Sequence, residues 1–451
     1  MARLWSRGEP LYGDHAWVER PQALLAAYRL VAASGWGPMV RVLAMLAASI
    51  ATVAVGAAAW ALAGRRAAVV AAALFAVLSP APHLEGFTAN GELMGLAGTA
   101  GAVAFGAWWS IRRDRRLLVL AGVAAAGGVL MKQGAADGLV AVAVLVLADG
   151  WRQRRNPLPD LAAFAGGAAL PVALALLHGV TTVGFDEWWF AMVGHRSTMD
   201  SLIRGSYDYH RAKFFESLGP FRRDLGMLVL LAPLGIVAAW RARRLTLPLT
   251  WLLASVVGVA AGGVFHPHYW LQVAAPLTLL AALGIDLVAT RWAPVAWALG
   301  AAMVLVPLAY SFPVYTARTA DRVSELTSAD HRYVIADEVA DAVAAMTEPD
   351  DRVAVLWTNA AIHWYADRAS PFRHMWFEPL ENFPGAAAAA RDTITGPDPP
   401  AVIVIATRLA SLDPDGEVAG ALATRYQLVD VVEGDRIYRL RSTLPAGASV
   451  P

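Results

Sequence analysis

Residues 41–80 read RVLAMLAASIATVAVGAAAWALAGRRAAVVAAALFAVLSP, two long apolar runs that meet at Arg65 and Arg66. A helix needs about 20 apolar residues to cross a hydrocarbon core of roughly 30 Å. Inside a bilayer only a helix or a closed barrel satisfies every backbone hydrogen bond, so these runs predict membrane-spanning helices. Their many Ala and Gly residues suit close helix packing in lipid.

The pattern of residues 41–80 recurs through the first two thirds of the chain. We expect about ten membrane-spanning helices, near 38–63, 66–80, 92–111, 116–131, 135–150, 160–180, 224–241, 246–264, 269–289 and 293–312. Of the 451 residues, 57% are hydrophobic and only 16% are charged, whereas a soluble protein carries roughly 25% charged residues. The sequence therefore predicts an α-helical polytopic membrane bundle over residues 1–312.

Residues 313–451 have a different character. They carry 12 Arg and 20 Asp or Glu, a net charge of −8 in a chain whose total is +1. We expect helices at 319–346 and 359–367, strands at 352–358 and 399–407, and a closing hairpin of 426–432 with 436–441. This pattern predicts a separate C-terminal α/β domain.

The arginines indicate the orientation of the bundle. They gather at alternate connections, as Arg65, Arg66, Arg112, Arg113, Arg115, Arg116, Arg152, Arg154, Arg155, Arg241, Arg243, Arg244 and Arg291. Cytoplasmic loops are enriched in Lys and Arg. We therefore expect a multi-pass protein of the cytoplasmic membrane, with loops 1–37, 81–91 and 181–223 and the C-terminal domain outside the cytoplasm.

The outward segments hold most of the polar residues that could perform chemistry, which favours a site on the outer face. The chain has no cysteine, which excludes disulfides and thiolate chemistry, and nothing indicates a nucleic-acid partner. In GEPLYGDHAWVERPQALLAAYRL (8–30), Asp14 could act as a general base toward a hydroxyl. The alternative is a solvated loop acid. Pro21 is placed to start a helix.

Two further segments offer charged groups at predicted helix ends. In SPAPHLEGFTANGELMGL (79–96), Glu92 opens a helix and Glu85 lies in the preceding loop. The alternative for Glu92 is helix capping, with Asn90 as the N-cap. In GGVLMKQGAADG (127–138), Lys132 could hold a phosphate, with Gln133 beside it. The alternative is a lysine that snorkels to the headgroups.

Aromatic and histidine side chains complete the candidate surface. In FHPHYWLQVAAP (265–276), His266 and His268 could bind phosphate or metal, but two histidines alone are a weak metal signal. Tyr269 also fits an interfacial aromatic belt. The aromatic residues of loop 181–223 suit either a mobile substrate loop or the membrane interface.

Taken in order, these segments resemble the GT-C glycosyltransferases, in the branch of the dolichyl-phosphate-mannose-protein mannosyltransferases and the bacterial aminoarabinose transferases. The markers are residues 8–30, RVLAML with Arg41, AGRRAAVVAAALFAVLSP (63–80), FTANGELM (87–94), GGVLMKQGA (127–135), HPHYWLQVAAPLTLLAALGI (266–285) and EPDDRVAVLWTNAAIHWYADRASPFR (348–373). The resemblance covers nearly the whole chain. It implies transfer of a sugar from a polyprenyl-phosphate carrier to a lipid, glycan or protein acceptor outside the cytoplasm.

For such a transfer a base activates the acceptor hydroxyl and cations stabilise the departing phosphate. We assign catalytic roles to Asp14 and Glu92, and substrate binding to Lys132, Gln133, Glu85, His268 and Tyr269. No metal ligand and no cofactor is assigned from the sequence, and a divalent cation is compatible with the site.

The acidic pair typical of this family would fall before Met1. One interpretation is that the chain is recorded from a late start. The other is that the pair is missing, in which case either Asp14 is the main base or the protein is inactive. The alternative function is that of a non-enzymatic membrane protein, a lipid-linked sugar transporter or an assembly partner. A transporter would be expected to show repeated halves and polar residues at mid-membrane, and the sequence shows no repeat.

Overall fold

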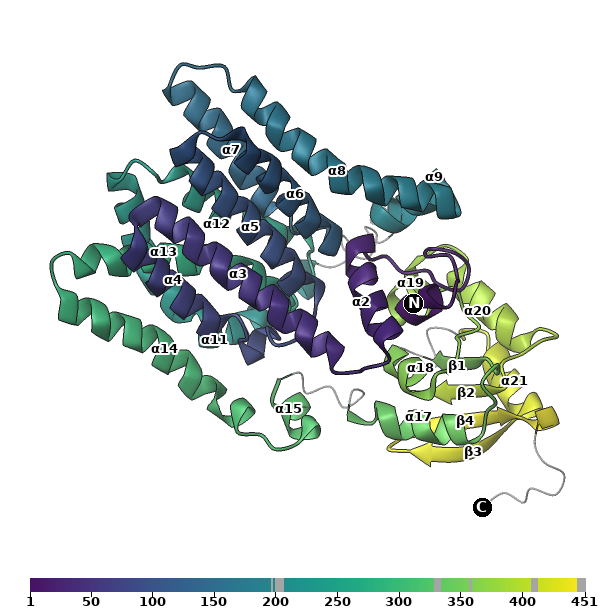
Figure 1. Cartoon of the computed structure of the whole chain (residues 1–451). Coiled ribbons are helices and arrows are strands. Elements are labelled where there is room, and N and C mark those ends of the chain that lie inside the picture. The colour runs from purple at the N-terminus through teal and green to yellow at the C-terminus, as the bar shows by residue number, and fades with distance from the viewer. Residues whose placement is uncertain (196–197, 199–206, 328–333, 357–358, 407–412, 444–451) are drawn as a thin grey trace. The chain divides into compact units, whose positions relative to one another are not determined.

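The computed structural model describes the chain outside residues 196–197, 199–206, 328–333, 357–358, 407–412 and 444–451 (Figure 1). The described chain forms two compact units. Unit 1 combines Met1–Glu19, Thr182–Arg204 and Ala317–Pro451, and unit 2 combines Arg20–Thr181 with Gly205–Thr316. The predicted boundary between residues 312 and 313 lies close to the passage from unit 2 to unit 1 at Thr316.

Unit 2 is a bundle of helices. Its elements are α2 (Gln22–Ser34), α3 (Met39–Ala63), α4 (Arg65–Leu78), η1 (Pro82–Leu84), α5 (Gly91–Arg112), α6 (Arg115–Met131), α7 (Asp137–Arg152), α8 (Leu158–Val183), α11 (Tyr207–Arg241), α12 (Thr246–Ala261), η3 (Pro267–Trp270), α13 (Leu271–Ala289) and α14 (Ala293–Tyr315). Each of the ten predicted spans coincides with a helix. Pro21 is the N-cap of α2, as the sequence indicated.

Five of the described helices are long and apolar enough to cross a membrane: Met39–Ala63, Leu158–Val183, Tyr207–Arg241, Pro267–Ala289 and Ala293–Tyr315. The protein is thus a membrane protein, while the predicted number of about ten spans stays a prediction. Helix α13 is the centre of the bundle, since 83% of its apolar window is buried against 17% in α8 and 22% in α14.

In unit 2 the backbones of neighbouring helices come into contact where one helix has a glycine facing the other. A Cβ atom at Gly235 of α11 would lie 1.9 Å from the carbonyl oxygen of Leu280 in α13. Only glycine fits there, and this packing of small residues is the kind that stabilises helices in lipid.

The expectation of a long outward loop over 181–223 is wrong for the described residues. Helix α8 continues to Val183, α9 (Phe185–Trp189) and the π-helical turn η2 (Phe190–Gly194) follow, and α11 already begins at Tyr207. Arg222 and Arg223, which lie just before the predicted span 224–241, are inside one 35-residue helix. Part of the predicted loop (196–197 and 199–206) lies outside the described residues.

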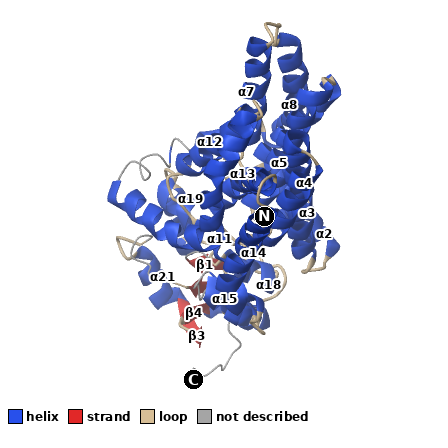
Figure 2. Ribbon diagram, turned by 90° about the vertical axis from the view of Figure 1, so that its left-hand side faces the viewer, coloured by secondary structure: helices blue, strands red, loops and turns tan. Residues whose placement is uncertain are grey.

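Unit 1 contains a four-stranded sheet (red in Figure 2) in the order β1-β2-β4-β3. The strands are β1 (Val353–Leu356), β2 (Val402–Ile405), β3 (Tyr426–Val432) and β4 (Asp435–Leu440), and the helices and turns are α1 (Ala2–Ser6), α15 (Ala320–Thr327), α17 (Ala336–Ala345), α18 (Ala360–Ala366), α19 (Phe377–Asn382), α20 (Ala386–Thr395), α21 (Glu417–Arg425) and η5 (Arg441–Thr443). β1 and β2 are parallel, and β4 is antiparallel to both β2 and β3. Instead of one helix over 319–346, the structure has α15 and α17, with 328–333 outside the described residues.

Both faces of this sheet are covered. Alternate residues of β1 and β2, such as Ile403, pack with α20 and α21 on one face. The intervening residues, such as Val402, pack with α17 and α18 on the other face. Strands buried on both sides read as continuous apolar runs, which is why VAVL and VIVI were recognisable in the sequence.

The polar N-terminus is part of unit 1. Arg3 and Arg7 both pair with Asp367, at 2.7 and 2.8 Å, and Arg3 also lies over the ring of Trp364. The two guanidinium groups lower the pKa of the Asp367 carboxyl below its usual value. These contacts account for the charge of a segment too polar to span a membrane.

Candidate functional site

Glu92 and Lys132 form a buried ion pair in unit 2. The Nζ of Lys132 lies 2.7 Å from Oε1 of Glu92, and the side chains are only 15% and 7% exposed. Glu92 is in the first turn of α5, and Lys132 follows the last turn of α6. A short connection joins the end of α5 to the start of α6, so the two helices are antiparallel neighbours. The start of α5 therefore lies beside the end of α6, where Glu92 and Lys132 meet. This placement differs from that of a lysine extended toward headgroups.

Glycines on one face of α5 permit this approach. A Cβ atom at Gly91 would lie 3.0 Å from the carbonyl oxygen of Met131, and one at Gly98 would lie 2.6 Å from the backbone nitrogen of Gly128. Asn90 caps the helix, since its side chain accepts a hydrogen bond from the Leu93 N–H at 2.8 Å. The predicted cap therefore exists together with the ion pair.

Three more predicted residues join the pair. The Lys132 ammonium lies 4.6 Å from the ring centroid of Tyr269, a cation–π distance. His268 Nε2 is 3.9 Å from Glu92 Oε1, and His268 Nδ1 is 3.2 Å from Glu85 Oε2. We call Glu85, Glu92, Lys132, His268 and Tyr269 the inner cluster.

Two neighbours of the inner cluster are His266, a candidate phosphate or metal ligand from the sequence, and Tyr28, which the sequence analysis did not single out. Burial first, and then the charge on His268, lowers the pKa of His266 to about 4, so His266 is neutral at physiological pH. Tyr28 of α2 donates a hydrogen bond to the Ala89 carbonyl. Burial and the Glu92 carboxylate raise the pKa of Tyr28 to about 12, which keeps the phenol protonated.

The loop that carries Glu85 is held firmly. Glu85 has a φ of 55°, in the left-handed region that non-glycine residues rarely adopt. His83 in the same loop donates from Nδ1 to Asp224 of α11 at 2.8 Å, and the Asp224 side chain is 1% exposed. This anchor fixes the loop to the bundle and offsets the backbone strain at Glu85.

A buried amide holds the turn after Lys132. Gln272 of α13 donates from Nε2 to the Gly134 carbonyl at 2.9 Å and to Asp137 Oδ1 at 2.8 Å. Asp137 Oδ2 in turn accepts from Trp251 Nε1 and Ser255 Oγ of α12. Since η3 leads directly into α13, Gln272 couples the backbone beside Lys132 to the segment that carries His268 and Tyr269.

The first half of α11 packs on η3. Trp270 Nε1 donates to Ser217 Oγ at 3.1 Å, and the Trp270 ring lies 4.7 Å from that of Phe221 and 6.3 Å from that of Phe214. His210 donates from Nδ1 to the Gly263 carbonyl at 2.6 Å. The orientation of His268 and Tyr269 therefore depends on α11.

Asp14 belongs to unit 1, in a second polar cluster. Its side chain is 85% exposed and lies 3.4 Å from Nη1 of Arg373, which also binds Glu187. Glu187 accepts a hydrogen bond from Trp17 Nε1 at 2.8 Å. The edge of the Trp17 ring meets His374, whose pKa is lowered to about 4 by burial and by Arg373.

The structure thus brings together five of the seven predicted site residues. Gln133 lies beside Lys132 in the turn and is half-buried. The roles of Gln133 and Asp14 stay predictions. Within the described residues, no three His, Cys, Asp or Glu side chains are placed to hold a metal ion. Gln272 and Asp224 were missed because each lies near the start of its predicted span, at 269–289 and 224–241, where a polar residue is expected at the membrane surface.

No protein-family model matches the sequence, and no curated protein matches it. Two crystal structures of ArnT from Cupriavidus metallidurans share its fold. The structure bound to undecaprenyl phosphate has a TM-score of 0.63 and 14% identity, and covers 100% of this chain and 93% of ArnT. The apo structure has a TM-score of 0.62 and 14% identity, and covers 98% and 93%.

A weaker match is the archaeal oligosaccharyltransferase AglB from Archaeoglobus fulgidus in complex with an inhibitory peptide and a dolichol-phosphate. It has a TM-score of 0.49 and 13% identity, and covers 99% of this chain and 70% of AglB. The likeness to ArnT extends over both units and shows that the chain shares the fold of ArnT. The fold resemblance predicted from the sequence motifs is thus confirmed.

Proposed function

We propose that the chain is a membrane glycosyltransferase that moves a sugar from a polyprenyl-phosphate carrier to an acceptor hydroxyl. The observation that carries the proposal is the inner cluster, in which one ammonium, two carboxylates and two rings meet from three separate segments. ArnT, which shares the fold, is an aminoarabinose transferase with a structure bound to undecaprenyl phosphate. The two arguments are independent, since one rests on side chains and the other on the backbone.

In this proposal the chain supplies charge stabilisation and positioning. A polyprenyl phosphate is already a good leaving group, so the main need is a cation for the charge that develops on it. Lys132 fills that role, and Glu92 holds its ammonium in place before the donor binds. His268 and Tyr269 shape the site around it, and Glu85 orients His268.

Activation of the acceptor is assigned to Asp14. Its carboxylate is exposed and its partner Arg373 is 3.4 Å away, so it is accessible to an acceptor hydroxyl. A base must reach the hydroxyl within hydrogen-bonding distance.

We also propose that the catalytic face and residues 313–451 lie outside the cytoplasm, in a protein of the cytoplasmic membrane. The arginines at the opposite ends of α5, α6 and α7 support this orientation. The inner cluster lies at the other ends of these helices, where Gly91 begins α5 and Met131 ends α6.

The alternative is a non-enzymatic membrane protein that transports or helps to assemble lipid-linked sugars. A transporter needs binding without bond cleavage. The distinction is therefore whether a polyprenyl-phosphate sugar is consumed.

The test uses the purified full chain in nanodiscs with a panel of radiolabelled polyprenyl-phosphate hexoses and pentoses. Release of free polyprenyl phosphate, with or without acceptor, is followed by chromatography. We expect release from one donor class, at least 100-fold slower in Lys132→Met, because one transition-state charge contact contributes about 2.7–4 kcal/mol. Lys213→Met is the matched control, since Lys213 pairs with Glu216 at the surface.

Three results would count against the proposal. Binding of a donor without release would support the transporter. Absence of both binding and release across the panel would remove lipid-linked sugars as substrates. Equal release by the two lysine variants would remove Lys132 from the phosphate role.

A further inference from the structure

Arginines crowd the end of the bundle that lies opposite the inner cluster. Here α5 ends, α6 begins, α7 ends and α8 begins. The arginines are Arg112, Arg113, Arg115, Arg116, Arg152, Arg154 and Arg155, and the acids nearby are Asp114, Asp149 and Asp160. Helix α6 has 17 residues, so this end is about 25 Å from Lys132 at 1.5 Å per residue. It is a separate region from the proposed donor site.

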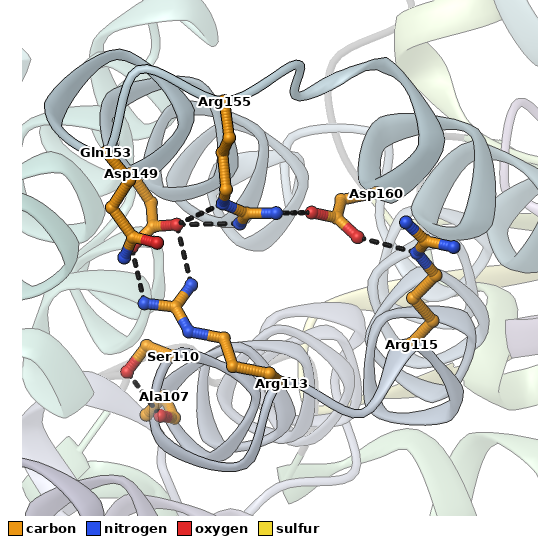
Figure 3. A network of polar contacts seen from close by, with 8 residues as sticks. All are labelled: Ala107, Ser110, Arg113, Arg115, Asp149, Gln153, Arg155 and Asp160. Carbon is orange, nitrogen blue, oxygen red and sulfur yellow. Dashed lines mark hydrogen bonds and ion pairs between the residues drawn. The ribbon is translucent and has the colours of Figure 1, made fainter.

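Two acids, the buried Asp160 and the half-buried Asp149, organise part of this charge (Figure 3). Asp149 accepts hydrogen bonds from Arg113, at 2.6 and 2.8 Å, and from Arg155 at 2.7 Å. Asp160 binds Arg155 and, at 2.8 Å, Arg115. The network thus uses two carboxylates to fix three guanidinium groups, and the region keeps an excess of positive charge.

Beside the network is an open groove of about 800 Å³. Its lining combines three guanidinium groups with apolar surface and consists of Leu147, Gly150, Trp151, Arg152, Arg154, Arg155 and Pro157. Trp151 is 83% exposed, and α8, a candidate membrane span, begins at Leu158, which is 65% exposed. The groove is therefore at the boundary between an apolar span and a polar surface.

The backbone shapes the groove. The Arg154 N–H donates to the Trp151 carbonyl and the Arg155 N–H donates to the Gly150 carbonyl, which closes the end of α7. Arg154 has a φ of 53°, and Arg152 donates to Thr246 Oγ1 at 2.7 Å. The guanidinium of Arg152, which Thr246 orients, therefore loses less conformational freedom when it binds an anion.

We propose that the groove binds the phosphodiester headgroup of an anionic phospholipid. Arg152 and Arg154 contact the phosphate oxygens, since the planar guanidinium matches phosphate geometry. Trp151 and Leu147 contact the glycerol and the first acyl carbons, as aromatic residues do at membrane interfaces. Basic pockets at helix ends bind anionic headgroups through the same combination of charge and apolar contact.

A bilayer lipid is the occupant that fits, because a soluble anion would leave Trp151 and Leu147 in contact with water. The groove also opens next to a helix of the length and composition of a membrane span, where lipid headgroups are concentrated. The groove does not take part in the proposed sugar transfer, so either proposal can fail without the other.

The test measures lipid binding to the full chain by native mass spectrometry in detergent. Arg152→Gln/Arg154→Gln is compared with Arg241→Gln/Arg243→Gln, two exposed arginines at the end of α11 that do not line the groove. We expect dioleoyl phosphatidylglycerol to bind the groove variant about 30-fold more weakly, corresponding to about 2 kcal/mol. The control variant should lose less than about 3-fold, and dioleoyl phosphatidylcholine should bind weakly throughout.

The proposal is overturned if both variant pairs lose the same affinity, which would indicate general surface charge. It is also overturned if the two lipids bind equally, or if millimolar inorganic phosphate displaces the anionic lipid, which would indicate a soluble-anion site. If the double variant does not fold, Arg154→Gln alone is used with the same criteria and an expected loss of about 5-fold.

Discussion

Replacement of Lys132 by Met separates the structural role of the ion pair from its proposed catalytic role. Methionine keeps most of the volume and removes the charge. Glu92 would then remain as a carboxylate whose side chain is 7% exposed, without its partner at 2.7 Å. Breaking one partner out of a buried pair costs about 3–5 kcal/mol, because the remaining charge has lost its compensation.

We expect Lys132→Met to destabilise the bundle by about 3 kcal/mol, at the lower end of that range, because His268 remains beside Glu92. The double variant Glu92→Gln/Lys132→Met removes both charges, so most of this stability should return. The proposed transfer should not return, because the cation for the departing phosphate is still absent. Lys213→Met, whose partner is exposed Glu216, should cost less than about 0.5 kcal/mol.

The assay combines unfolding in detergent, followed by tryptophan fluorescence, with release of polyprenyl phosphate from the donor. If the double variant is no more stable than Lys132→Met, the ion pair is not what the single change disrupts. If the double variant releases the carrier at the rate of the natural chain, the positive charge at position 132 has no part in the reaction.

Three other predictions follow from the structure. Gln272→Leu should lower the free energy of unfolding by about 1–3 kcal/mol, because the Gly134 carbonyl and Asp137 lose a buried hydrogen-bond donor. The same change should raise KM for the lipid donor more than it lowers kcat. The control is Gln153→Leu, which replaces an exposed amide. Burial holds the pKa of His363 at about 4, against an unfolded value of 6.5. Between these two values the folded chain binds fewer protons than the unfolded chain, so the stabilisation is fully present above pH 6.5 and is lost as the pH falls. The free energy of unfolding should therefore fall by about 2.5 kcal/mol between pH 7.5 and 4.5. His363→Gln should flatten that dependence in unfolding measurements, and an unchanged slope would assign it to other groups. The chain has no cysteine, so single cysteines can report the orientation. Asp415→Cys should react with an impermeant maleimide in intact cells after outer barriers are opened, whereas Arg154→Cys should react only after lysis. The reverse result would invert the proposed orientation.

The helices could be predicted from sequence because many of the apolar runs are bounded by a charged residue or a glycine. Arg65 begins α4, and Arg113 and Asp114 separate α5 from α6. The expected start of α11 was late because Arg222 and Arg223 interrupt the hydropathy without interrupting the helix. Local chemistry also located the Asn90 cap, since a cap depends on only a few neighbouring residues.

The candidate residues could be chosen from sequence, but their pairing could not. The contact between Glu92 and Lys132 depends on the register of α5 against α6, and the glycines that set it are individually unremarkable in an Ala- and Gly-rich chain. Asp137 reads as an acid at a helix end, and only the fold shows that α12 and α13 surround it. Glu187 and Arg373 are 186 residues apart, so no local pattern could have joined them.

Helix α11 has 35 residues and is therefore about 52 Å long, well beyond a hydrocarbon core of roughly 30 Å. If its apolar second half spans the membrane, its first half extends beyond it, and that half carries Ser217 and Phe221 against Trp270. The tilt of such a helix responds to bilayer thickness through hydrophobic mismatch. A change in the tilt of the embedded half would shift Ser217 and Phe221 against Trp270, the residue that follows Tyr269. We therefore expect the thickness of the host membrane to affect the geometry of the inner cluster.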